Sequence, residues 1–174
     1  MVGVSTDVDA VDPDHRPAVL TSGLSIVALL LGVLSSALYS PFVLVGGAAA
    51  LVLLGGGLWT GSRRAVTIGT AVALAGLLAG GIQGVPSVPM LASVTATVLA
   101  WDAGHHAVGI GEQLGREATT ARAELPHVGA TVVVGLVAAV GSYAVFIAGP
   151  SGQPVAAVIA MLFGAILLLA ALQR

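Results

Sequence analysis

The sequence predicts an all-α, polytopic integral membrane protein with six transmembrane helices arranged as three hairpins. Hydrophobic residues make up 57% of the 174 residues and charged residues only 8%, and the mean hydropathy is +1.04. A soluble domain carries about 25% charged residues, so this chain has too little charge to cover a water-exposed surface. Its uncharged runs also offer the roughly 20 apolar residues that a bilayer span needs, and each run contains a proline-bearing turn.

The first hairpin is expected between residues 17 and 62, where no side chain is charged. Ser40 and Pro41 interrupt this run and divide it into spans at 18–39 and 42–60. Proline is well tolerated in the first turn of a helix, because the N–H that it lacks would have no partner there.

The second and third hairpins are expected at 65–83 with 87–106, and at 128–148 with 154–172. The second is tight, since removing its turn leaves only about 16–17 residues for each helix, short of a full span. Either these helices are short, or the fourth continues past Trp101 and carries Asp102 about one turn into the membrane. The two alternatives differ in what Asp102 can do.

The arginines set the expected orientation. With six spans and a cytoplasmic N-terminus, every basic residue falls on the cytoplasmic side, as the positive-inside rule requires for short loops. We therefore predict a multi-pass protein of the cell (plasma) membrane with both termini in the cytoplasm and an acidic, disordered tail at residues 1–16. The basic residues are Arg16, Arg63, Arg64, Arg116, Arg122 and Arg174.

Glycines recur every four residues at Gly76, Gly80 and Gly84. Small residues at this spacing lie on one face of a helix and let two helix backbones approach closely in lipid. The pattern predicts a helix-packing face on the third span.

The segment 102–127 holds most of the charge of the chain outside the tail, together with three of the four histidines. Apolar residues at helical spacing between Leu114 and Leu125 predict a cytoplasmic amphipathic segment over 107–127, with a helix that ends at Pro126. Its charged side chains are the predicted partner-binding residues, and the first two are spaced for a helical ion pair. They are Glu112, Arg116, Glu117, Arg122 and Glu124.

Asp102, His105 and His106 are the candidates for ion chemistry. If the fourth helix continues past Trp101, the spacing i, i+3 and i+4 places them on one face, where a carboxylate and imidazoles can bind a metal or relay protons. Alternatively, Asp102 is an ordinary interfacial carboxylate that faces Arg63 or Arg64.

Several function classes are excluded or disfavoured. The chain has no cysteine and no lysine, so it has no disulfide, no thiolate metal site and no lysine-dependent phosphate loop or Schiff base. Its net charge of −2 lacks the basic block that nucleic-acid binding requires. No hydrolase or metalloprotease motif is present, so we expect no enzyme activity, no cofactor and no nucleic-acid partner.

The stretch from Trp101-Asp102 through Gly111-Glu112-Gln113-Leu114-Gly115-Arg116 to Glu124-Leu125-Pro126-His127 resembles a family of uncharacterised haloarchaeal membrane proteins. The absence of lysine, the glycine- and alanine-rich spans and the acidic tail are similar as well. The resemblance is specific over these 27 residues and extends to the layout of the whole chain. Such proteins tend to be encoded beside a MoxR-type ATPase, which implies a membrane part of an ATPase-linked assembly system. The resemblance supplies no catalytic residue.

Two functions follow as expectations. The first is a non-enzymatic membrane scaffold or assembly component that docks a soluble, ATPase-linked partner through the 102–127 segment. The second is a small proton, cation or solute transporter that uses Asp102 with His105 and His106. The lipid bilayer is the expected surrounding in both, and homo-oligomerisation is left open.

Overall fold

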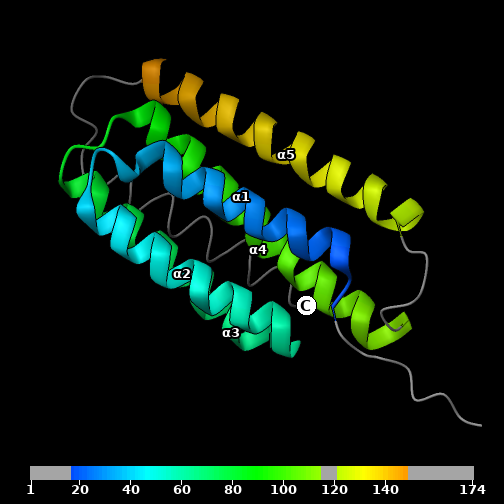
Figure 1. Cartoon of the computed structure of the whole chain (residues 1–174). Coiled ribbons are helices and arrows are strands. Elements are labelled where there is room, and N and C mark those ends of the chain that lie inside the picture. The colour runs from blue at the N-terminus through cyan, green and yellow to red at the C-terminus, as the bar shows by residue number, and fades with distance from the viewer. Residues whose placement is uncertain (1–16, 115–120, 149–174) are drawn as a thin grey trace, which may run out of the picture. The chain divides into compact units, whose positions relative to one another are not determined.

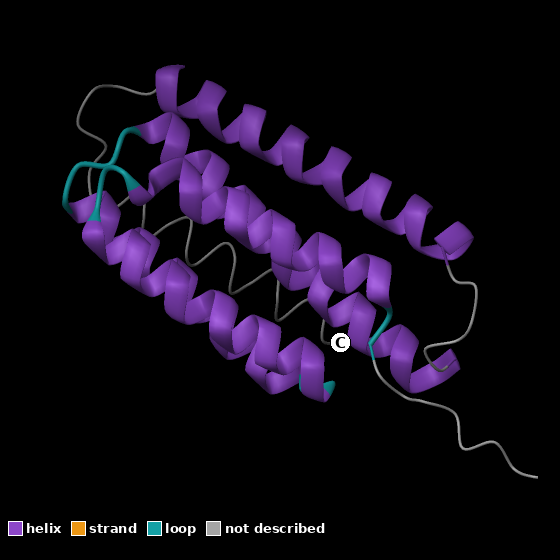
Figure 2. Cartoon of the chain, viewed as in Figure 1, coloured by secondary structure: helices purple, strands orange, loops and turns teal. Residues whose placement is uncertain are grey.

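The computed structural model describes residues 17–114 and 121–148, which form five helices and no strand. The helices, shown in Figures 1 and 2, are α1 (Val19–Ala37), α2 (Pro41–Thr60), α3 (Arg63–Ile82), α4 (Ser87–Leu114) and α5 (Ala121–Ala148). The predicted all-α class is therefore confirmed for this part of the chain. The predicted tail at 1–16 and the predicted span at 154–172 lie outside the described residues.

Four of these helices are long and apolar enough to cross a membrane: α1, α2, α3 and the Glu124–Ala148 part of α5. The remaining one, α4, carries Asp102, Glu112 and two histidines over its 28 residues. The four helices are compatible with a polytopic membrane protein, whereas the span predicted at 87–106 falls in α4, which is not among them.

The chain divides into two compact units, residues 1–139 and 140–174. The first contains α1 to α4 and the first two thirds of α5. The described part of the second, residues 140–148, is the end of α5, where the rings of Tyr143 and Phe146 stack with centroids 6.3 Å apart.

Within the first unit, α1 packs mainly along α4 and α2 mainly along α3, and further contacts between α1 and α2 and between α3 and α4 close the bundle (Figure 1). The connections between consecutive helices are only a few residues long, so neighbouring helices run antiparallel. The N–H of Ala18 donates to the carbonyl oxygen of Ala107 at 3.1 Å, which joins the start of α1 to the second half of α4.

Local sequence signals explain the turns. Ser40 and Ser62 cap α2 and α3, because each hydroxyl oxygen accepts from the backbone N–H three residues later, and Pro41 occupies the first turn of α2. Gly61, at φ 69°, ends α2 in the left-handed conformation that favours glycine. Gly84, at φ 86°, has the same conformation in the turn after α3.

The bundle has polar side chains inside and large apolar side chains outside. Many leucine, valine and isoleucine side chains of α1 to α3 face outward, whereas the interior contains small hydroxyl side chains beside aliphatic ones. This distribution suits lipid, in which helices associate through close packing and interhelical hydrogen bonds rather than through a hydrophobic driving force. The buried hydroxyl residues are Thr21, Ser25, Ser36, Ser40, Thr70, Ser93 and Thr97.

Glycines bring α2 and α3 into backbone contact. A Cβ atom added to Gly76 would lie 2.9 Å from the carbonyl oxygen of Phe42, and one added to Gly80 would lie 2.6 Å from a methyl group of Val43. Gly76 and Gly80 therefore face α2. Gly84, the third residue of the predicted packing face, lies beyond the end of α3, in a turn where an added Cβ would contact nothing within 4 Å.

The helix boundaries differ from the sequence-based prediction around the segment 107–127. The fourth helix does continue past Trp101, and it ends at Leu114, while α5 begins at Ala121 and runs through Pro126. The prediction that a helix ends at Pro126 was wrong. A proline close to a helix start removes only one early backbone hydrogen bond, which is consistent with the helix continuing through Pro126.

Candidate functional site

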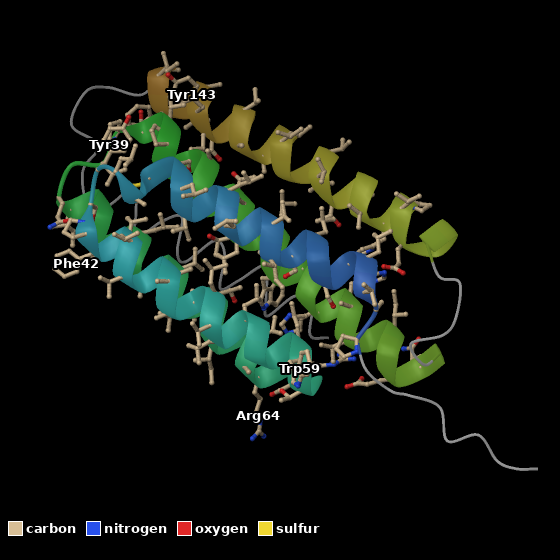
Figure 3. All side chains as sticks on the ribbon, viewed as in Figure 1. Tyr39, Phe42, Trp59, Arg64 and Tyr143 are labelled. Atoms are coloured by element: carbon tan, nitrogen blue, oxygen red, sulfur yellow. The ribbon has the colours of Figure 1, made fainter. Side chains whose placement is uncertain are left out.

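The described charged side chains gather at the end of the bundle where α1 begins. Arg63, at the start of α3, donates to a carboxylate oxygen of Glu112 on α4 at 2.6 Å, and both side chains are about half exposed. Figure 3 shows Arg64 pointing away from the helices near Trp59, while Tyr39 and Phe42 lie at the opposite end. That opposite end, in the described connections 38–40 and 83–86, has no charged side chain.

Asp102 lies farther inside the bundle than this surface pair. It precedes Ala107, the level at which α1 begins, by five residues, which at 1.5 Å per residue is about 7 Å along α4. One of its carboxylate oxygens accepts from Thr131 Oγ1 at 3.0 Å and lies 3.1 Å from His127 Nε2, both on α5. Asp102 thus faces α5 rather than Arg63 or Arg64.

Two imidazole rings complete this cluster. The ring of His127 stacks on the ring of His106, with centroids 3.9 Å apart and an angle of 13° between the planes. Since an ionised carboxylate only accepts hydrogen bonds, the Nε2 atom of His127 carries the hydrogen that it shares with Asp102. Burial, and after it the neighbouring His127, lower the pKa of His106, and the carboxylates of Asp102 and Glu124 offset only part of this effect.

A small cavity of about 60 Å³ adjoins the cluster. Asp102 and Thr131 supply its polar lining, and the rest is aliphatic: Leu24, Ala28, Leu99, Ala103, Val128 and Val132. The surface of the cavity is almost entirely apolar, so it offers a water molecule or an ion few of the polar partners that either would need.

His105 does not belong to the cluster. Its Nδ1 atom donates to the carbonyl oxygen of Trp101 at 3.0 Å, and its Nε2 atom lies 3.2 Å from Thr67 Oγ1 on α3. The predicted grouping of Asp102 with His105 and His106 therefore separates into two: Asp102 and His106 face α5, and His105 faces α3. Among residues 17–114 and 121–148, no three acidic or histidine side chains are placed to hold a metal ion.

Glu124 stabilises the start of α1. Ala18, the N-cap residue of α1, makes no side-chain cap, so an orphan N–H in the first turn needs another acceptor. The buried carboxylate of Glu124 accepts from the backbone N–H of Thr21 at 3.1 Å and from the hydroxyl group of Thr21. Its negative charge also interacts favourably with the helix dipole at this end. α5 therefore caps α1.

The predicted partner-binding residues fall into three groups. Glu112 is half exposed and pairs with Arg63, whereas Glu124 is only 2% exposed and points into the protein. Arg116 and Glu117 lie outside the described residues, as does the side chain of Arg122.

Sequence reasoning did not place His127 and Thr131 in the site. The available signal was their spacing of four residues, which puts both on one face of a helix. However, His127 had been expected to lie between a helix that ends at Pro126 and a separate span that begins at residue 128. Once α5 runs through Pro126, both side chains face Asp102 on α4.

Comparison with known proteins gives a family but no function. The model described as "Family of unknown function (DUF7519)" matches residues 15–169. No curated protein and no solved structure matches the chain.

Proposed function

The chain belongs to this family of unknown function, and we propose that it is a non-enzymatic, multi-pass component of the cell membrane that docks a soluble partner at its charged end. The proposal is supported by four helices that are long and apolar enough to cross a membrane. The docking surface includes the exposed part of the segment 102–127 and the neighbouring start of α3.

The observation that carries this proposal is the asymmetry between the two ends of the bundle. One end presents the half-exposed Arg63–Glu112 pair and Arg64, whereas the described connections at the other end carry no charge. A charged surface at only one end is what an aqueous partner on one side of the membrane would require, and such complementarity mainly provides specificity and a fast association rate. With both termini and all arginines in the cytoplasm, that partner is cytoplasmic.

The expected partner is a soluble ATPase of the MoxR type, which the resemblance to haloarchaeal membrane proteins implies. Such a partner would couple this membrane component to an assembly or maturation system. Its recognition would depend on the arrangement of charges on α3 and α4 and on Arg116, Glu117 and Arg122.

A charge swap tests the docking role. The single variant Glu112→Arg opposes Arg63 with a like charge, whereas the double variant Arg63→Glu/Glu112→Arg restores the pair with inverted polarity. We expect both variants to lose binding of the purified ATPase in a detergent pull-down, while the double variant keeps the thermal stability of the wild type. Wild-type binding by the double variant would contradict the proposal.

The position of Asp102 supports a second candidate, a small proton or cation transporter. α4 continues past Trp101, and the carboxylate of Asp102, whose side chain is 33% exposed, lies between α4 and α5 beside a small cavity. If α4 lies within the membrane, an ionisable group at this position is a functional candidate. In proteoliposomes, Asp102→Asn would then abolish ion flux, and a flux equal to that of the wild type would exclude this role. His105→Gln, in the same helix but outside the cluster, is the matched control.

A further inference from the structure

We propose that a pocket between the start of α1 and the end of α2 binds one anionic phospholipid, with its phosphate group at Arg64 and a hydrocarbon chain against Gly55 and Ile26. The inference rests on the proposed place of the chain in a membrane. It involves neither the Arg63–Glu112 pair of the docking surface nor ion flux, so its test is separate from both.

The pocket opens at the outside of the helix bundle. Its volume is about 200 Å³, much more than one water molecule needs. Three of its lining side chains face outward, since Val19, Ile26 and Trp59 are 62%, 39% and 79% exposed. In a membrane, lipid covers the outward-facing surface of such a bundle, so a lipid molecule is the ligand that has direct access to the pocket.

The depth of the lining residues follows the order of groups in a phospholipid. Trp59 lies near the end of α2, and tryptophan is enriched at the level of the lipid head groups. Gly55 lies four residues deeper on α2, about 6 Å at 1.5 Å per residue, and Ile26 lies seven residues, about 10 Å, deeper on α1 than Val19. The mouth of the pocket thus lies at the interface and its inner part is apolar.

Arg64 supplies a positive charge at the mouth. It is exposed and follows Trp59 by five residues across the turn between α2 and α3, and Figure 3 shows it near Trp59 and directed away from the helices. Arg63 pairs with Glu112, whereas Arg64 has no ion-pair partner among residues 17–114 and 121–148. A guanidinium group binds a phosphate group through two parallel hydrogen bonds, so Arg64 favours an anionic lipid.

Ser22 is a polar group part of the way down the pocket. Its hydroxyl oxygen is buried and has no hydrogen-bond partner among the described residues, and an unsatisfied buried polar atom costs free energy. Ser22 lies three residues deeper than Val19, about 5 Å along α1. This is the level of the glycerol oxygens of a lipid whose phosphate group is at the mouth. Rotation about χ1 would let the hydroxyl group donate to one of them.

Gly55 leaves the space that the hydrocarbon chain occupies. A Cβ atom added to Gly57 would lie 2.8 Å from the backbone nitrogen of Val66, so the small size of Gly57 allows α2 and α3 to pack closely. A Cβ atom added to Gly55 would contact nothing within 4 Å, although Gly55 lines the pocket. A larger side chain at position 55 would therefore fill the pocket without disturbing the helix packing.

Native mass spectrometry of the full chain in detergent tests the site. The delipidated protein is titrated with phosphatidylglycerol or with phosphatidylcholine that carries identical hydrocarbon chains. We expect one phosphatidylglycerol to bind about fivefold more tightly than phosphatidylcholine, the factor that one basic residue near an anionic lipid surface provides. Equal affinity for the two lipids would overturn the proposal.

Variants locate the lipid. Gly55→Leu should lower the affinity for both lipids severalfold. Gly56→Leu is the matched control, because position 56 is equally open but does not line the pocket. Arg64→Gln should remove the preference for phosphatidylglycerol, and Arg64→Lys should retain it. Wild-type lipid binding by Gly55→Leu, or the same loss in Gly56→Leu, would overturn the site.

Other occupants of the pocket give different results. Displacement of the lipid by inorganic phosphate at equal concentration would indicate a site for free phosphate. A lower thermal stability of Gly55→Leu without loss of lipid would indicate that another segment of the chain fills the pocket. Either result would overturn the proposal.

Alkaline carbonate extraction of native membranes tests the membrane location separately. Release of the chain into the soluble fraction would overturn the proposed function and the lipid site together. A chain that stays in the membrane but shows no preference for the anionic lipid would overturn the lipid site alone.

Discussion

The two main contacts of the bundle, α2 with α3 and α1 with α4, are built from different side chains. Between α2 and α3, glycines allow backbone contact: a Cβ atom on Gly69 would lie 2.9 Å from the backbone nitrogen of Leu54, and one on Gly46 3.1 Å from the Cα of Gly76. Between α1 and α4, serine hydroxyl groups form hydrogen bonds that centre on Ser93.

The two contacts therefore differ mainly in their polar side chains. At these glycines, the contact between α2 and α3 has no room for an added atom, so the two helices are held closely together. The contact between α1 and α4 contains directional hydrogen bonds, and α4 also carries Asp102, His106 and Glu112 on its other faces. The helix that holds the candidate site is therefore attached to α1 by polar groups as well as by a close approach at Gly32, where an added Cβ would lie 3.2 Å from the carbonyl oxygen of Ser93.

The largest expected effect comes from disrupting the backbone contact between α2 and α3. In Gly69→Leu, a branched side chain would overlap the backbone of α2, and we expect a loss of about 3 kcal/mol or more in the free energy of unfolding. Thermal unfolding in detergent and gel filtration measure it. Gly56→Leu is the control, because a Cβ there would contact nothing within 4 Å. Equal stability of the two variants would contradict the backbone contact.

A smaller loss is expected when α5 no longer caps α1. Glu124→Ala removes a buried carboxylate that accepts two hydrogen bonds from Thr21. Loss of a cap costs about 1 kcal/mol, and a bond to a buried charge contributes more than a neutral one, so we expect a total of about 2 kcal/mol by thermal unfolding. Glu112→Ala, which removes a half-exposed carboxylate, should cost at most about 1 kcal/mol. If the two losses were equal, Glu124 would not be a buried cap.

The sequence predicted the all-α class and the first three apolar helices, because composition and uncharged runs are properties of whole segments. It also located glycines of α3 that meet α2, since Gly76 and Gly80 repeat with the helical period. It did not predict the role of Glu124, because a carboxylate that caps a helix more than a hundred residues away leaves no local pattern. Asp102 was a candidate from the sequence, but its contacts with His127 and Thr131 depended on α5 running through Pro126.

The serine contacts between α1 and α4 were not predicted from the sequence either, because serines within apolar helices show no periodic pattern. Their removal is expected to have the smallest of the predicted effects. Ser93 donates to the carbonyl oxygen of Gly32 at 2.6 Å, and its hydroxyl oxygen lies 2.7 Å from those of Ser35 and Ser36. Interhelical hydrogen bonds in membranes contribute about 0.6 kcal/mol on average and at most about 1.7.

We therefore expect Ser93→Ala to lower the free energy of unfolding by about 1 kcal/mol, measured by thermal unfolding in the same detergent as the glycine variants. Thr95→Val is the matched control on the same helix, because the hydroxyl group of Thr95 donates to the carbonyl oxygen of Leu91 within α4. Its removal should leave stability nearly unchanged. A loss in Ser93→Ala as large as that in Gly69→Leu would mean that the hydrogen bonds of Ser93 hold α1 to α4 as strongly as the glycine contacts hold α2 to α3, and the expected order of the two effects would be wrong.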